Sequence, residues 1–425
     1  MQRGRIAIET LISHDLAARP QPAPLAGKTV AVVHAAWHSC GSYQVNASQL
    51  RAYRALGART ISIAMMDAPT PSPPHGRWRV YLAATADLCA DARYLCGPSL
   101  AHVPTPSFLA DAWWKLIHGD QASYLIELAR RAAPPPALAA ETIDLIHANH
   151  FFTLPLVSRL RRSGNIPVML ETQDIQARQF ILRNQGGFFL APRATYDGML
   201  AIELDWMKTA DLCIHLNEEE RADFARLLPE ARHRLVYPAI APVPAGPGGS
   251  RIILVASDNY ANYVSLRWLL EEVLPRAPEV PVEIYGNIDG GVRSRDGALY
   301  EANRRYFKGR VEDIGRIYAE AACILLPTIE GHGLSIKAVE ALSSGAPLIA
   351  TRLAFRGMKI DPTRLANVTL VETAADFAAA LRALPERRET TPRPLADTRR
   401  LYDETFSFAA YERALLAAAA PLLRL

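Results

Sequence analysis

A glycine-rich turn followed by a lysine and a glutamate is the part of the sequence best suited to chemistry. The segment 327–351 reads PTIEGHGLSIKAVEALSSGAPLIAT, with Gly331 and Gly333 between a predicted strand and a predicted helix. Glycines at such a turn let backbone N–H groups approach an anion at the helix N-terminus. Lys337 and Glu340 are three residues apart and therefore share one face of that helix.

The lysine and the glutamate have two interpretations. A cation beside exposed amides suits a diphosphate, and a carboxylate one turn deeper suits the two hydroxyls of a ribose. Alternatively, Lys337 and Glu340 form only a surface ion pair, as many such pairs do. The complete string, which also contains Leu334 and Ser335 at the helix start, favours the nucleotide site.

Short apolar runs alternate with helical stretches and must position this turn. A Pro- and Gly-rich linker, 237–250, separates two series of them. The strongest strand candidates are Lys28–His34, Ile61–Met65, Arg251–Ala256, Ala322–Leu326 and Pro347–Thr351. A loop that contains Gly41, Ser42 and Tyr43 precedes a predicted helix over 45–58, which ends at Gly57. Residues 263–277 are predicted to form a strongly amphipathic helix.

The alternation predicts an α/β protein with two doubly wound, Rossmann-like domains that face each other. We expect an N-terminal extension over 1–26, a first domain over 27–240 and a second over 248–390. A C-terminal helical segment, 391–425, could pack back on the first domain.

Composition excludes several classes of protein. The 425 residues carry a net charge of +4 without any block of five like charges, which argues against a nucleic-acid-binding tail. Five cysteines without a Cys-x-x-Cys pair argue against a disulfide framework and a zinc site, so we expect a reducing, cytoplasmic setting. No apolar run approaches 18 residues, so no membrane-spanning helix is expected. The Trp113-Trp114 pair could contact lipid or an acceptor, but we expect it to pack on the core.

The C-terminal half resembles a known family. The turn, then Lys337, Glu340, Gly345 and the pair Arg356-Gly357, resembles the donor-site signature of retaining GT-B glycosyltransferases of the group-1, family-4 type. The stretches VASDNYANYVSLRWLLEEVLP, YFKGRVEDIGRIYAEAACILLP, DLIHANHFFTLP and VMLETQDIQARQ are similar to other landmarks of this family. The resemblance covers roughly 28–357 and is strongest beyond 250.

The resemblance implies a GT-B fold with the donor nucleotide on the second domain and the acceptor on the first. Glu340 would bind the ribose hydroxyls, and Lys337 with the amides from Gly333 onward would meet the diphosphate. The backbone near Arg310 and Val311 would meet the base. The loop with Gly41, Ser42 and Tyr43 would close on the phosphates or the acceptor.

Three departures from the family pattern concern catalysis. The glutamate expected eight residues before Glu340 is replaced by His332, and Glu330 lies two residues earlier, so both are candidates for contacting the donor sugar. In place of the Arg and Lys that often open the second domain, the chain offers Asn259, Asn262 and Arg267. The His-x-His of the first domain becomes HANH, in which Asn149 holds the register and His150 follows; either could lie at the cleft, although a strand-end histidine is often only structural.

Glu171 and Asp174 also follow a predicted strand, where ligands collect in such sheets. Capping of the next helix by Asp174 is the alternative. No metal or other cofactor is expected, because the chain lacks an Asp-x-Asp site and its histidines lack metal-ligand spacing.

The expected activity is therefore sugar transfer, with retention, from a nucleotide-sugar to a glycan, lipid-linked or protein acceptor, as in surface polysaccharide or glycoconjugate synthesis. The enzyme would work in the cytoplasm, at the inner face of the membrane if it makes peripheral contact there. A nucleotide-sugar epimerase or phosphorylase on the same fold, or a catalytically silent binding protein, remain alternatives.

Overall fold

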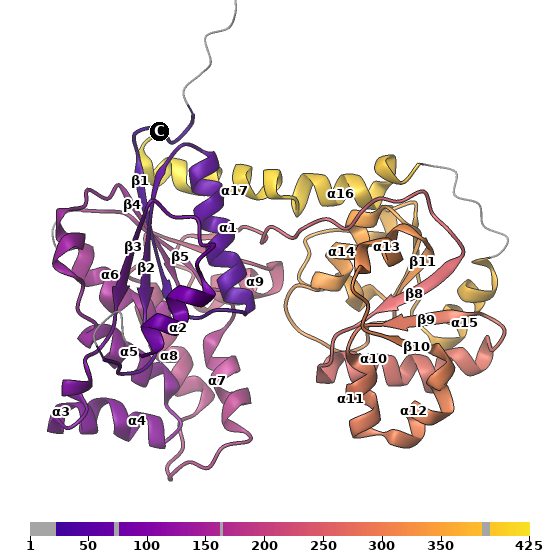
Figure 1. The fold of residues 1–425 in the computed structure, drawn as a ribbon, viewed down its shortest axis with the longest axis horizontal. Coiled ribbons are helices and arrows are strands. Elements are labelled where there is room, and N and C mark those ends of the chain that lie inside the picture. The colour runs from indigo at the N-terminus through magenta and orange to yellow at the C-terminus, as the bar shows by residue number, and fades with distance from the viewer. Residues whose placement is uncertain (1–22, 72–75, 162–164, 385–391) are drawn as a thin grey trace, which may run out of the picture.

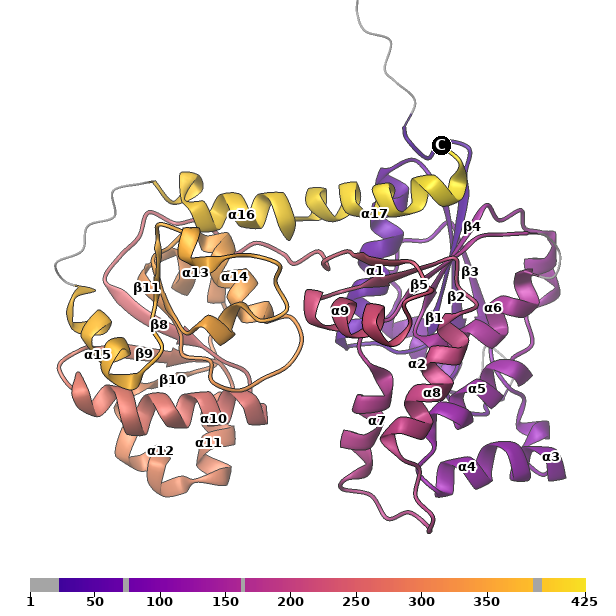
Figure 2. The same cartoon turned by 180° about the vertical axis from the view of Figure 1, so that it is seen from behind.

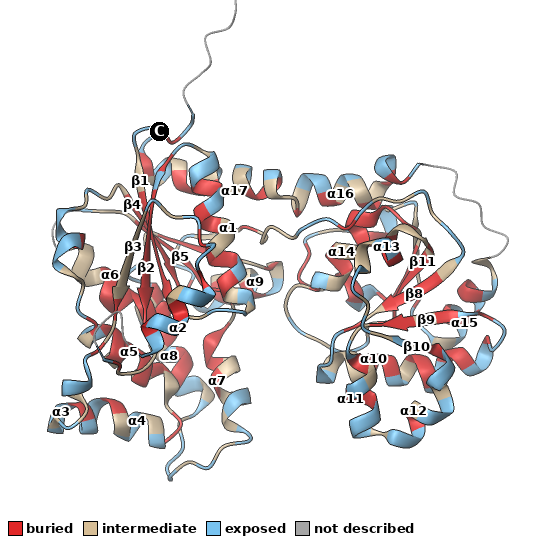
Figure 3. Cartoon of the chain, viewed as in Figure 1, coloured by how far each residue is buried: buried red, intermediate tan, exposed pale blue. Residues whose placement is uncertain are grey.

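A computed structural model describes residues 23–71, 76–161, 165–384 and 392–425. Within these residues the chain forms two parallel sheets, one of seven strands and one of six, each covered by helices on both faces (Figures 1 and 2). The central strands of both sheets are buried, the edge strands are only partly buried, and exposed residues lie on the helices and loops around them (Figure 3). The predicted α/β class with two Rossmann-like domains is confirmed. Most of the expected N-terminal extension, residues 1–22, lies outside the described residues.

The first domain has the strand order β3-β2-β1-β4-β5-β6-β7. Its strands are β1 (Thr29–Ala35), β2 (Arg59–Met65), β3 (Ala92–Cys96), β4 (Leu145–Asn149), β5 (Val168–Glu171), β6 (Leu212–His215) and β7 (His233–Leu235). Its helices are α1 (Gly41–Ala55), α2 (Arg77–Ala84), α3 (Pro106–Phe108), α4 (Trp114–Ile117), α5 (Gln121–Arg131), α6 (Leu154–Arg161), α7 (Gln176–Asn184), α8 (Tyr196–Met207) and α9 (Glu218–Leu227).

The second domain has the strand order β10-β9-β8-β11-β12-β13. Its strands are β8 (Arg251–Val255), β9 (Val282–Tyr285), β10 (Phe307–Gly309), β11 (Ala321–Leu326), β12 (Leu348–Ala350) and β13 (Val368–Leu370). Its helices are α10 (Tyr260–Trp268), α11 (Ile288–Arg295), α12 (Gly297–Asn303), α13 (Ile314–Ala319), α14 (Ile336–Ser344) and α15 (Ala374–Arg382). The strand order reverses between β1 and β4 and again between β8 and β11, and ligands of such sheets bind beyond the carboxyl ends of the strands at these points.

The chain passes between the domains twice. The linker 236–250 contains neither helix nor strand, and the C-terminal helices α16 (Asp397–Thr405) and α17 (Phe408–Leu423) run along both domains (Figure 2). α16 packs on α14, whereas α17 packs on α1 and β4. The two passages meet: the Ile240 N–H donates to the Phe406 carbonyl at 3.1 Å, and the Tyr402 hydroxyl donates to the Ile240 carbonyl at 2.7 Å.

The C-terminal stretch differs from the sequence expectation on membrane spans. Asp397–Leu423 is long and apolar enough, by length and composition, to cross a membrane. The structure divides it at Phe406 and Ser407 into α16 and α17. Tyr411, Leu415 and Ala419 of α17 are buried in the core of the first domain, so the apolar residues of this stretch serve packing there.

Candidate active site

The glycine-rich turn follows β11 at the switch point of the second sheet. Gly331 and Gly333 have φ of 139° and 66°, in the region that favours glycine. A Cβ on Gly331 would lie 2.8 Å from the Arg356 guanidinium, whereas a Cβ on Gly333 would meet no atom within 4 Å. The backbone at Gly333 is therefore open to a ligand, and Gly331 packs against Arg356.

Helix α14 begins directly after this turn. The Ser335 side chain caps it by accepting from the Ala338 N–H at 3.4 Å. Other N–H groups of the first turn have no acceptor within the helix, and they concentrate partial positive charge at its N-terminus. Because this end of α14 points out of the turn that carries Gly333, it forms a site suited to phosphate oxygens.

Lys337 and Glu340 lie one turn apart on α14 and form an ion pair of 2.8 Å between Nζ and Oε2. The Tyr318 hydroxyl also donates to Glu340 Oε2, at 3.4 Å. Burial and the nearby carboxylate raise the pKa of Tyr318 well above its usual range, so the phenol keeps the proton that it donates. The two side chains share one face of α14, as predicted, and they also form the ion pair of the alternative interpretation. This pair is only partly exposed, at 37% for the lysine and 22% for the glutamate.

The other predicted donor residues lie along the same edge of the sheet. Asn259 follows β8 and caps α10 by accepting from the Asn262 N–H at 2.8 Å. The Ile329 N–H donates to Ser265 Oγ at 3.2 Å and thereby connects α10 to the glycine-rich turn. Arg310 and Val311 follow β10, which is separated from β8 by β9. All these strands are parallel, so their carboxyl ends lie at one edge of the sheet. Asn259, Arg310, Val311 and the glycine-rich turn are therefore on the same side of the domain.

Arg356 supports the turn from the side. Its Nε donates to the His332 carbonyl at 3.4 Å, and the charges of Glu219 and Glu330 partly offset the lowering of its pKa by burial. The Glu330 and His332 side chains themselves are exposed. The turn is thus held mainly through its backbone, and both side chains are free to face a donor sugar.

In the first domain, His150 follows β4 at the switch point. It adopts φ of 63° and is 2% exposed. Its ring stacks on Phe152 at 5.0 Å and meets Trp37 edge-on at 5.1 Å, and burial lowers its pKa to about 3. The imidazole is therefore neutral, and neither ring nitrogen has a hydrogen-bond partner among the described residues.

Asn149 is placed differently from His150. It is fully buried and exchanges two hydrogen bonds with Gln49, at 3.0 and 2.8 Å, while its oxygen also accepts from Gln173. These bonds hold β4 to α1. In this arrangement the amide of Asn149 is engaged within the protein and does not face the edge of the sheet.

The Gly41–Tyr43 segment is not the loop that we expected. These residues form the first turn of α1, because Cys40 is already its N-cap. Tyr43 is buried and its hydroxyl donates to Asp87 at 2.8 Å, and burial with this carboxylate raises its pKa to about 12. Tyr43 therefore anchors α1, whereas Gly41 and Ser42 remain at the helix N-terminus.

Asp174 does not cap the following helix. The first two N–H groups of α7, those of Gln176 and Ala177, instead donate to the buried carboxylate of Glu203 at 3.0 and 2.9 Å. Burial raises the pKa of Asp174, and Arg183 and Arg178 oppose that shift. Glu171 is fully buried beside Tyr53 of α1 and Tyr411 of α17, and so lies beneath α17 and not in a ligand site.

A cavity of about 550 Å³ lies beside these residues in the first domain. Trp37 forms part of its wall and its indole N–H donates to Asp67 at 2.9 Å, while Arg77 lies 3.4 Å from the same carboxylate. The lining residues are Ala36, Trp37, His38, Cys40, Met66, Asp67, Arg77, Val80, Tyr81 and Arg183. Sequence reasoning missed them, although Trp37 and His38 directly follow β1, where strand-end ligands are expected.

Comparisons with known proteins show what this chain is similar to. Residues 249–387 match the family model described as Glycosyl transferases group 1. No curated protein sequence matches the chain. Among solved structures, Anabaena HepE in complex with UDP is similar with a TM-score of 0.59 at 13% identity, covering 93% of this chain and all of that one.

Two further structures have the same architecture. Sucrose-phosphate synthase from Thermosynechococcus elongatus gives a TM-score of 0.57 at 17% identity, covering 93% of this chain and 99% of that one. α,α-Trehalose 6-phosphate synthase from Burkholderia multivorans gives 0.53 at 12%, covering 93% and 98%. The chain has the GT-B fold, and its match to the Glycosyl transferases group 1 model lies within the second domain.

Proposed function

We propose that this protein is a retaining glycosyltransferase that takes its sugar from a uridine diphosphate donor. The observation that carries the proposal is the joint position of Lys337, Glu340 and the open backbone at Gly333, at the start of α14 in a group 1 domain. UDP is the first nucleotide to test because the similar HepE structures contain UDP and UDP-glucose.

In this proposal the second domain stabilises the leaving group. Negative charge develops on the diphosphate as the bond to the sugar breaks, so a fixed cation and helix dipole bind the transition state more strongly than the ground state. Lys337 and the N-terminus of α14 would supply this stabilisation without a metal ion. Glu340, already held by Tyr318, would accept hydrogen bonds from the ribose hydroxyls.

The acceptor would bind in the cavity of the first domain. Trp37 presents an aromatic wall suited to a sugar ring, and Asp67 and His38 are polar groups that can orient hydroxyls. His150 lies beneath Trp37 as a neutral imidazole, able to accept or donate one hydrogen bond. Glu330 and His332, on the glycine-rich turn, would contact the donor sugar from the other domain.

The test is nucleotide release by the full-length protein from a panel of UDP-, GDP-, dTDP- and ADP-sugars, with and without EDTA. We expect release from a UDP-sugar that persists in EDTA. Lys337→Ala should lower the rate by about 10²–10³-fold, as expected for loss of one preorganised electrostatic contact. Glu340→Gln should chiefly weaken UDP binding, read as a smaller rise of Tm with UDP.

Lys208→Ala and Asp205→Asn are matched controls, because this pair is also spaced i,i+3 but lies exposed on the first domain. Both should keep the wild-type rate. Absence of any Tm shift with UDP or GDP, together with no release from any donor, would contradict the proposal. Once an acceptor is found, the anomeric configuration of the product, measured by NMR, tests retention.

A further inference from the structure

Large apolar side chains are exposed at one end of the first domain. We define the basal patch as Leu109, Trp114, Ile117, Phe188 and Leu190, which come from the α3–α4 region and from the segment between α7 and α8. Trp114 is 56% exposed and Phe188 is 89% exposed. Both segments lie at the end of the domain opposite to α17 (Figures 1 and 2). Trp114 thus does not pack on the core as we had expected, whereas Trp113 does.

The two segments of the basal patch are hydrogen-bonded into one surface. The Leu190 N–H donates to the Ile117 carbonyl at 2.9 Å, and the Ala194 N–H donates to the His118 carbonyl at 2.8 Å. The His118 ring in turn contacts Trp114 at 4.6 Å between centroids. The patch is therefore a fixed feature of the fold.

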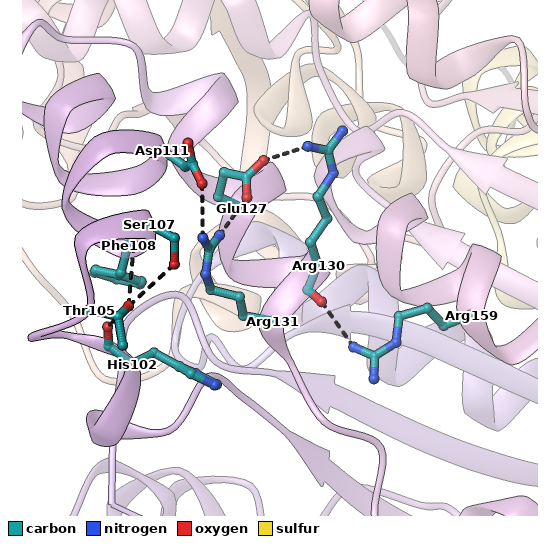
Figure 4. A network of polar contacts seen from close by, with 9 residues as sticks. All are labelled: His102, Thr105, Ser107, Phe108, Asp111, Glu127, Arg130, Arg131 and Arg159. Carbon is teal, nitrogen blue, oxygen red and sulfur yellow. Dashed lines mark hydrogen bonds and ion pairs between the residues drawn. The ribbon is translucent and has the colours of Figure 1, made fainter.

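A polar network fixes the α3–α4 region to α5 (Figure 4). Arg131 pairs with Glu127 and, at 3.1 Å, with Asp111, while its guanidinium lies over the ring of Phe108. Thr105 caps α3. The network holds the patch in place, and it neutralises Asp111, which lies between Leu109 and Trp114 in the sequence.

Cations accompany the exposed apolar residues. Three basic residues lie in or next to the same segments: Lys115, Arg183 and Arg193. Among the described residues, none of the three has an acidic partner within 4 Å. Protruding Trp and Phe side chains among free Lys and Arg are typical of surfaces that enter the headgroup region of an anionic bilayer. An interface with a second protein copy would instead favour fewer free charges near its apolar centre.

The patch is connected to the proposed acceptor cavity through α7. Arg183 lines that cavity and is the neighbour of Leu182 on α7, which is itself exposed, and Val80 on the opposite wall is 61% exposed. Helix α7, which carries Arg183 and the exposed Leu182, leads directly into the segment with Phe188 and Leu190, so one element connects the cavity to the basal patch. A molecule anchored in a bilayer could present its head group to the cavity from this side.

We propose that the basal patch docks the first domain on an anionic lipid bilayer and thereby delivers a lipid-linked acceptor to the cavity. The docking stands on the exposed residues alone, whereas the acceptor class rests on the proposed sugar transfer. Trp114 and Phe188 insert between headgroups, and Lys115, Arg183 and Arg193 meet lipid phosphates.

The experiment is co-sedimentation of the full-length protein with vesicles of phosphatidylcholine, with and without phosphatidylglycerol. We expect wild-type protein to bind the mixed vesicles, and Trp114→Ser/Phe188→Ser to bind at least about tenfold more weakly because two exposed aromatic anchors are lost. Lys115→Gln/Arg193→Gln should bind mixed vesicles more weakly and pure phosphatidylcholine unchanged. Brominated lipids should quench wild-type tryptophan fluorescence more strongly than that of Trp114→Phe.

Leu395→Ser/Leu425→Ser is the matched control, because these leucines are 63% and 57% exposed but lie outside the patch. It should bind as wild type does. The patch variants keep the donor site intact, so nucleotide release with a water-soluble donor separates failure of docking from failure of the proposed function. The proposal would be overturned if wild-type protein did not co-sediment with the mixed vesicles. It would also be overturned if the protein self-associated and Trp114→Ser/Phe188→Ser abolished that association.

Discussion

Glu171 is the residue whose burial has the clearest measurable consequence. Its side chain is fully buried, and neither carboxyl oxygen has a hydrogen-bond partner among the described residues. Burial raises its pKa well above the usual value; the nearby backbone N–H of Gln173 opposes this shift, and the charge of Asp174 adds to it. The native protein therefore holds Glu171 as a neutral acid, because a buried unpaired carboxylate would be too unfavourable.

Stability should consequently fall as pH rises. Native Glu171 keeps its proton above pH 4.5, where the unfolded chain loses it, so the contribution is full below that pH and is lost as pH increases toward the native pKa. Glu171→Gln is neutral in both states. We expect its free energy of unfolding, relative to wild type, to improve by up to about 1.4 kcal/mol per pH unit as the pH rises above about 5.

Urea unfolding at a series of pH values measures this difference. Glu272→Gln is the control, because Glu272 is 55% exposed and should show no such trend. A difference between Glu171→Gln and wild type that stays constant with pH would show that Glu171 is ionised in the native protein.

The residues of the proposed donor site could be predicted from the local sequence. Its glycines, Lys337 and Glu340 lie within ten residues on one turn and one helix, so local sequence rules sufficed to place them together. The cavity proposed for the acceptor was missed because Trp37, Asp67, Arg77 and Arg183 come from four separate segments that only the fold brings together. Periodicity carries no signal for such long-range contacts.

At the scale of elements, buried parallel strands were the most predictable part. β1, β2, β8, β11 and β12 all fall within or beside the apolar runs in the sequence, because both faces of such strands are covered. β7, β10 and β13 are edge strands whose residues are only partly buried or exposed, so they lack the continuous apolar run of a strand that is covered on both faces.

One predicted helix differs from the structure. The predicted helix over 263–277 is divided into α10, a π-helical turn over Leu269–Val273 and a 3-10 turn over Leu274–Arg276 that contains Pro275. Pro275 cannot donate a backbone hydrogen bond, which ends the regular helix before it. Amphipathic spacing alone did not reveal this.

Helix α17 offers a test of how the C-terminal element packs. The Tyr411 hydroxyl is buried without a hydrogen-bond partner among the described residues, whereas the Tyr53 hydroxyl contacts His147 Nδ1 at 3.0 Å. Tyr411→Phe should therefore be neutral or stabilising by up to about 1 kcal/mol, and Tyr53→Phe should cost about 1–3 kcal/mol. Thermal and urea unfolding compare the two, and an equal loss in both would mean that Tyr411 has a partner.

At the scale of the whole molecule, we predict that donor binding closes the domains. Lys337 and Glu340 lie on the second domain and the acceptor cavity on the first, so transfer requires both to approach one sugar. Closure would also exclude water from the reacting groups. We expect the radius of gyration, measured by X-ray scattering, to decrease when UDP is added.

Lys337→Ala supplies the comparison, since it should weaken UDP binding and abolish the decrease. Equal scattering profiles for the wild type with and without saturating UDP would mean that UDP alone does not close the domains.

The meeting of the linker and the C-terminal helices at Ile240 and Phe406 determines what kind of motion closure can be. Two connections that are bonded to each other at one place act as a pivot, which permits rotation and prevents one domain from sliding past the other. Rotation about a fixed pivot keeps each point of the donor site at a constant distance from that pivot. The donor site and the proposed acceptor cavity therefore approach each other by rotation alone. Most of the translational entropy that two separate domains would lose on meeting has already been lost on folding.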